Sequence, residues 1–153
     1  MYLRTYVDLA LDFEDVRAAL LRGRPPACVQ EAARVAEQEC AVLLASAGLA
    51  SSSQFATWPT AVEADVPITT DRLASVPLCL YSGRTLLTRL ATLDAGWLGA
   101  GRTHLSLSMS YETRLDEPNG IRDRALLHRV HEAVALRFLD AIADSLLAAT
   151  VPV

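Results

Sequence analysis

The chain has 153 residues, a formal net charge of -4 and a hydrophobic content of 52%. This composition excludes a disordered protein, and the negative charge argues against a partner that is a nucleic acid. All fourteen basic residues are arginine, which removes Schiff-base and P-loop lysine chemistry and is typical of a GC-rich bacterial genome. The length is that of one domain, so we expect residues 1–153 to form a single domain.

The cysteines and the N-terminus indicate where the protein works. Cys28, Cys40 and Cys79 are odd in number and widely spaced, as expected of reduced thiols in the cytoplasm. The first residues carry Arg4 and Asp8, so they do not form an apolar signal region. Although residues 40–62 are uncharged, their serines and Gln54 make the stretch too polar to cross a membrane.

The front of the chain predicts one strand and two helices. Apolar and polar residues alternate over residues 1–9, which favours a strand. A short helix is expected over residues 14–21. A longer amphipathic helix should begin at Pro25 and Pro26 and end at Gly48, because proline suits a first helical turn and glycine suits the end.

The middle of the chain predicts strands, each bounded by glycine, proline or aspartate. The expected strands cover residues 54–59, 62–68, 76–82, 85–93 and 103–113. In the last of them Leu105, Leu107, Met109 and Tyr111 alternate with polar residues, which indicates an antiparallel sheet covered on one face. Trp97 lies between Gly96 and Gly99, so we expect it in a turn.

The end of the chain carries the longest helical pattern. Apolar residues recur every three or four positions over residues 123–149. The predicted fold class is therefore α+β: a curved antiparallel sheet gripping a long C-terminal helix, with two shorter helices after the first strand.

This layout resembles the START-like, or SRPBCC, helix-grip superfamily, and its most specific stretch is similar to uncharacterised actinobacterial members. The matching residues are Gly101, Thr103, Tyr111, Asp123, Arg124, Leu126, Leu127, His128 and Arg129. One departure is the charged stretch at residues 112–118, which would reshape a cavity mouth. The resemblance implies a cavity between sheet and helix that takes lipids, polyketides, plant hormones or aromatic rings, in proteins that range from carriers to cyclases.

The candidate ligand-binding residues lie on the predicted sheet and closing helix. They are Arg89, Tyr81, Trp97, Leu107, Met109, Tyr111, Leu127, His128, Val130, Val134 and Phe138. Arg89 and His128 would orient a ligand, although Arg89 is better explained as a surface residue or as the partner of Asp94 or Glu63, because charged residues are seldom buried unless paired. Trp97 would be a lid or a packed loop anchor, and Tyr111 a cavity wall or ordinary core.

Two other chemistries fail on spacing. His128, His131 and Glu132 read H-x-x-H-E, whereas zinc-protease helices place their histidines four residues apart, so we expect no metal and interpret both histidines as rim residues. The serines at 106, 108 and 110 lack a nucleophile turn and fit a solvated strand face. We expect no cofactor.

The sequence thus favours binding or carrying of a small hydrophobic or aromatic molecule. One alternative is a polyketide cyclase or aromatase that uses His104, His128 or Tyr81 as acid or base. Another is a structural or dimerising domain whose interior is filled by its own side chains, and a homodimer stays open. A cavity of about 300 Å³ or more under the C-terminal helix would favour binding.

Overall fold

A computed structural model describes residues 2–48, 58, 61–82, 85–110 and 120–150, of which 82, 85–89 and 120–124 are described by their backbone alone. Its elements follow the predicted order of one strand, two helices, further strands and one long helix. They are β1 (Tyr2–Leu9), α1 (Phe13–Leu20), α2 (Ala27–Ser46), β2 (Ala61–Ala64), β3 (Ile68–Thr69), β4 (Leu73–Ser82), β5 (Thr85–Gly99), β6 (Arg102–Ser110) and α3 (Gly120–Thr150). The predicted α+β class with a long closing helix is confirmed.

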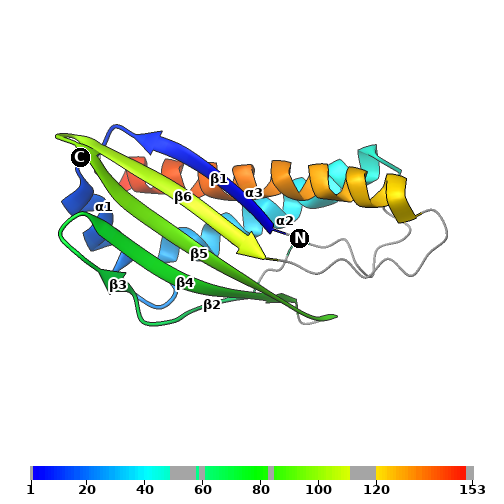
Figure 1. Cartoon of the computed structure of the whole chain (residues 1–153), viewed down its shortest axis with the longest axis horizontal. Coiled ribbons are helices and arrows are strands. Elements are labelled where there is room, and N and C mark those ends of the chain that lie inside the picture. The colour runs from blue at the N-terminus through cyan, green and yellow to red at the C-terminus, as the bar shows by residue number, and fades with distance from the viewer. Residues whose placement is uncertain (1, 49–57, 59–60, 83–84, 111–119, 151–153) are drawn as a thin grey trace.

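The strands form one antiparallel sheet in the order β1-β6-β5-β4-β2, and β3 pairs with β4 beside this path. The register places Leu3 opposite Met109 and Met109 opposite Ala91, so these three inward residues form one row across the sheet. Figure 1 shows the sheet curving around the helices, with β1 along its upper edge. No strand in the described part of the chain pairs with the outer side of β1.

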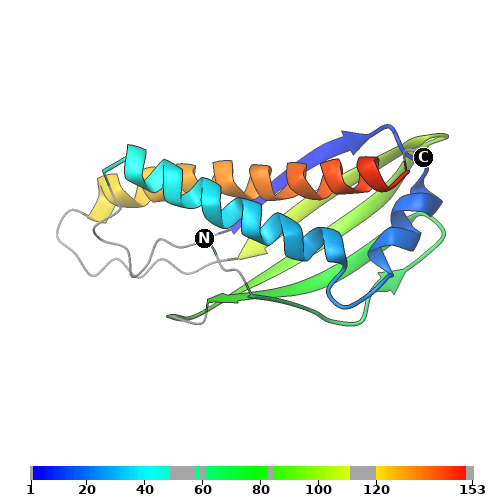
Figure 2. The same cartoon turned by 180° about the vertical axis from the view of Figure 1, so that it is seen from behind.

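The two long helices lie side by side across the inner face of the sheet, as Figure 2 shows. Helix α2 turns a stripe of small residues inward, including the fully buried Ala32, Ala33 and Ala36. Small side chains let two helix backbones approach closely, because little volume separates them. Gly48 ends α2 with a φ of 74°, a conformation that costs glycine nothing, as the sequence predicted for this position.

The core lies between the sheet and the helices, and it is almost entirely aliphatic. Along β6 the inward residues Thr103, Leu105, Leu107 and Met109 are at most 1% exposed. Strict period two is what one covered face requires. On the outer face, Ser108 is half-buried and Ser110 is exposed, but Ser106 is buried, so the expected solvated serine face holds only in part.

Three strand predictions need correction. Trp97 is not in a turn: β5 continues through it, paired with Thr103, and the chain reverses only where Gly99 and Gly101 adopt positive φ angles. Gly96 lies within the strand, where it pairs with Leu73 on one side and with His104 on the other. The run at 62–68 is two strands, since β2 ends at Ala64 and β3 begins after Pro67. The expected strand at 54–59 falls outside the described residues except for Trp58, which belongs to no strand.

Candidate functional site

The structure brings most of the predicted wall residues together in the space between sheet and helix. Six of the predicted wall residues lie there; each is at most 7% exposed, and all six belong to one apolar cluster. They are Leu107 and Met109 of β6, and Leu127, Val130, Val134 and Phe138 of α3. Removing these side chains from water is favourable by about 25 cal/mol per Å² of apolar surface, which holds the helix on the sheet.

Trp58 is a member of this interior that the sequence did not mark as a site residue. Its side chain is 1% exposed, and its ring lies 5.8 Å from that of Phe138 at an interplanar angle of 46°. Such tilted pairs are favourable beyond the area that they bury. Trp58 lies in the strand predicted over 54–59 and follows an uncharged, serine-rich stretch, so its sequence neighbours do not indicate whether it is buried.

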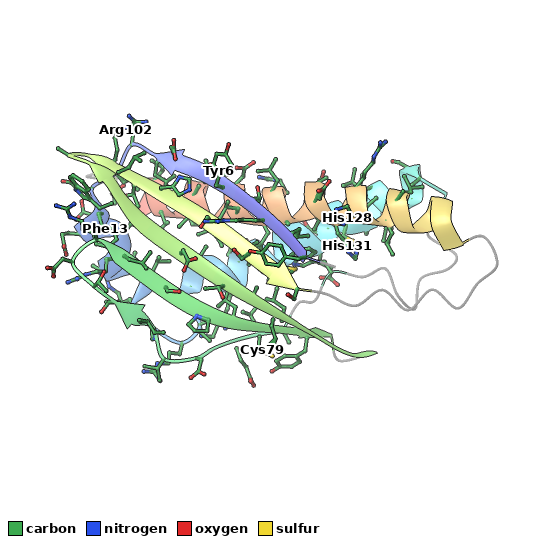
Figure 3. The ribbon with its side chains drawn as sticks, viewed as in Figure 1. Tyr6, Phe13, Cys79, Arg102, His128 and His131 are labelled. Carbon is green, nitrogen blue, oxygen red and sulfur yellow. The ribbon has the colours of Figure 1, made fainter. Side chains whose placement is uncertain are left out.

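His131 is a second interior residue that the sequence placed wrongly. It was expected at the rim, but it is 1% exposed, whereas the side chain of His128 is 33% exposed. Figure 3 shows both histidines on the early part of α3, beside the start of β1. The signal was present, because position 131 lies between Leu127 and Val134 on the apolar stripe of the helix. His131 is thus an imidazole placed within an aliphatic core.

Helix α3 lies close to one side of the sheet only. Its Cα atoms come within 8 Å of β1 and β6 but, in the described ranges, not of β2, β4 or β5. The central strands turn small apolar residues toward it, including Ala74 of β4 and Ala91 and Ala95 of β5, all 4% exposed or less. The same strands also bury larger aliphatic side chains, Val76, Leu78 and Leu80 of β4 and Leu93 of β5. The backbone of α3 is thus farther from β4 and β5 than from β1 and β6.

Two predicted residues lie apart from this interior. The Tyr81 hydroxyl donates a hydrogen bond of 3.0 Å to Glu63 Oε1, and the carboxylate raises the pKa of that phenol. Tyr81 follows the inward Leu80, so strand alternation turns it to the outer face. Trp97 is 47% exposed, with the Arg72 guanidinium 4.7 Å from its ring centroid.

The remaining histidines have carboxylate neighbours. Nδ1 of His104 lies 2.7 Å from Asp8 Oδ1 on the outer face of the sheet, and the His104 ring lies 5.3 Å from that of Tyr6. Nε2 of His128 lies 3.2 Å from Glu132 Oε1. His104, named for acid–base chemistry, therefore lies on the other side of the sheet from the apolar interior.

Two further predictions concern parts that the structure leaves undescribed. The backbone of Arg89 pairs with Leu80, but its side chain is not described. Tyr111 lies outside the described residues.

In the described ranges no three His, Cys, Asp or Glu side chains could together hold a metal ion. None of the helices described has the length and hydropathy needed to span a bilayer.

A groove opens at the outer edge of β1, on the flank of α3. Its volume is about 410 Å³. It is lined by Leu3, Arg4, Thr5, Arg129, Glu132, Ala133 and Leu136. None of the candidate ligand-binding residues lines it, so it is a separate feature from the interior.

Comparison with known proteins shows that solved structures share this architecture. No protein-family model and no curated protein matches the sequence. A protein of Thermus thermophilus superposes with a TM-score of 0.51 at 10% identity, over 99% of this chain and 100% of that one. A conserved protein of Geobacillus kaustophilus superposes with a TM-score of 0.58 at 11% identity, over 97% of each chain.

A third structure, the ZhuI aromatase/cyclase of Streptomyces sp. R1128, gives a TM-score of 0.43 at 15% identity, over 96% of this chain and 93% of that one. The layout expected from the sequence resemblance is thus present over nearly the full length of the chain. The chain therefore has a helix-grip fold, in which an antiparallel sheet packs around a long C-terminal helix.

Proposed function

We propose that the protein binds a small, mainly hydrophobic molecule between the inner face of the sheet and α3. The observation that carries this proposal is the position of the helix, which approaches β1 and β6 but stands away from β4 and β5. Both surfaces that face this space are apolar and shielded from water. A ligand would gain affinity mainly by burying its own apolar surface there, at about 25 cal/mol per Å².

His131 would supply the polar contact that orients such a ligand. Binding sites for small molecules combine an apolar lining with a few placed polar groups. Among the buried side chains described, His131 and Thr103 are the polar ones on inward positions, and His131 is the one on α3, beside the apolar residues Val130 and Val134. An imidazole can donate or accept, so a ligand with one hydroxyl or carbonyl group suits this interior best.

Binding can be tested with the two tryptophans. A Trp97→Phe variant leaves Trp58 as the sole tryptophan, in contact with Phe138 inside the core. Titration with naphthalene, decanol and similar uncharged molecules should shift its fluorescence emission. Native mass spectrometry of protein purified from its own cells should show an adduct. An unshifted emission together with a clean mass would contradict the proposal.

A second candidate function, a structural domain with a filled interior, is favoured by the contact between Trp58 and Phe138. The Val134→Phe variant distinguishes the ligand-binding function from the structural one. If ligand space exists beside this fully buried residue, the larger ring enters it, stability is kept and binding is lost. If the interior is filled, overpacking costs about 1–3 kcal/mol. Leu147→Phe, at a position 38% exposed on the same helix, is the control.

A further inference from the structure

Strand β1 forms an edge of the sheet that is open to pairing with another strand (Figure 1). It pairs with β6 over all eight of its residues without a bulge, and its sequence YLRTYVDL contains no proline or glycine. Edge strands usually avoid association through short length, proline, bulges or charge, because their free N–H and C=O groups pair readily. Of these features β1 has only charge, and its two charged residues, Arg4 and Asp8, have opposite signs.

The two faces of β1 limit how a second strand can align with it. The inner face has two buried leucines, Leu3 and Leu9, with the half-buried Thr5 and Val7 between them. The residues at even positions, from Tyr2 to Asp8, are all exposed on the outer face. A second copy of β1 must match inner residues with inner ones, because a slip of one residue would turn its apolar face outward.

The charges select one alignment for two copies of β1. In an antiparallel pair about a two-fold axis, one residue lies opposite itself and fixes the register. With Tyr6 on the axis, Arg4 of each copy lies opposite Asp8 of the other, which is favourable twice over. With Arg4 or Asp8 on the axis, like charges meet. With Thr5 or Val7 on the axis, no charge lies opposite another.

The same register also matches the apolar residues. Leu3 of one copy lies opposite Leu9 of the other, and Thr5 lies opposite Val7, so the half-buried pair gains cover on its open side. On the neighbouring flank of α3, Leu136 is 43% exposed and lines the groove beside β1. Joining the two edges makes the grooves of the two copies face each other below the strands, which shields this leucine from water.

Both charged side chains are available for the contact. Arg4 is exposed, and no hydrogen bond or ion pair joins it to a residue in the described ranges. Asp8 has His104 Nδ1 2.7 Å from one oxygen and an Arg102 nitrogen 4.0 Å from the other. A carboxylate accepts several hydrogen bonds, so these neighbours leave room for a guanidinium.

We propose that two copies of the chain associate through β1, with Tyr6 on the two-fold axis, to form one continuous antiparallel sheet. The contact lies at the edge of the sheet and is separate from the interior, so it does not depend on the function proposed above. Sedimentation equilibrium should show monomer and dimer in exchange, with a Kd in the micromolar range.

Exchange of the two charges tests the register. Arg4→Asp puts aspartates opposite each other and Asp8→Arg puts arginines opposite each other, so each variant alone should have a Kd at least about tenfold higher. An equal mixture of the two variants should recover the dimer, because each copy then meets the opposite charge at both positions. Arg34→Asp, at an exposed position of α2, is the control and should match the parent protein. Circular dichroism checks that every variant keeps the fold.

A disulfide locates the axis independently. Tyr6→Cys should form a covalent dimer under mild oxidation, because Cβ atoms of directly opposite residues lie about 4.5–5.5 Å apart, close to disulfide geometry. Tyr2→Cys, exposed on the same face, should not. In this register the two copies of residue 2 are about 26 Å apart, at about 3.3 Å per residue. The parent protein gives the background from its own three cysteines.

Three results would overturn the proposal. The parent protein could remain a monomer up to millimolar concentration. The mixture of charge variants could associate no better than each variant alone. Tyr2→Cys could cross-link as readily as Tyr6→Cys, which would place the contact in another register or on another surface.

Discussion

Truncation of Phe138 to alanine tests the packing of the interior. Phe138 is fully buried, and its ring lies 5.8 Å from that of Trp58. Loss of a buried phenylalanine costs about 3–5 kcal/mol, because its apolar surface no longer leaves water on folding and a cavity remains. About 0.5–1.5 kcal/mol of this cost should come from the aromatic pair.

The assay is urea unfolding followed by far-UV circular dichroism, which does not depend on the tryptophan signal. Arg137→Ala, at the neighbouring and 44% exposed position, should change the free energy of unfolding by less than about 0.5 kcal/mol. A double-mutant cycle with Trp58→Leu and Phe138→Leu isolates the ring–ring term, since both single variants keep an apolar side chain.

Two results would refute the reasoning. A Phe138→Ala cost below about 1 kcal/mol would mean that the residue is not surrounded on all sides, because full burial is what makes truncation expensive. A coupling energy near zero in the cycle would mean that the two rings do not meet as described, since contacting residues normally couple by about 0.5 kcal/mol or more.

Three other changes have defined outcomes. Glu63→Gln should lower the pKa of Tyr81, which now lies above its ordinary value of 10.0. Ultraviolet titration measures this pKa, with Tyr81→Phe as the reference. The stability that the contact between Glu63 and Tyr81 contributes is present at neutral pH and is lost as the pH rises through the raised pKa. Ala36→Leu should cost about 1–3 kcal/mol in urea unfolding, and an unchanged midpoint, equal to that of Ala41→Leu on the exposed side, would refute close packing of α2. Burial raises the pKa of the Cys28 thiol, so iodoacetamide should modify it more slowly in native protein than in urea; equal rates would argue against that burial.

The order of the elements was predictable because it depends on local patterns. Alternation predicted β1 and β6, and a helical period predicted α3 over 123–149, close to the observed Gly120–Thr150. Local pattern also explains the wall residues Leu107, Val134 and Phe138, because the apolar face of an element is the one that it buries. The identification of a helix-grip fold rested on this order and on the resemblance.

Where polar and aromatic residues lie was decided by tertiary structure. The sequence favoured His104 for acid–base chemistry and His131 for the rim, yet His104 meets Asp8 outside the sheet and His131 is enclosed by the core. Trp97 looked like a turn residue because glycines flank it, but pairing with β6 extends the strand through it. The contact between Asp8 and His104 joins residues 96 positions apart, and contacts so distant leave no local pattern in the sequence.

The groove at β1 likewise depends on tertiary packing that local sequence patterns do not predict. Arg4 lies in the predicted first strand and Arg129 in the predicted closing helix, 125 positions apart in a chain of 153. Only the packing of α3 against the edge of the sheet places them on one groove. Sequence by itself determined the order of the elements and most of the apolar faces that they bury, because both follow from periodicity. The tertiary structure decided which charges and rings share a site, because that depends on how distant elements pack.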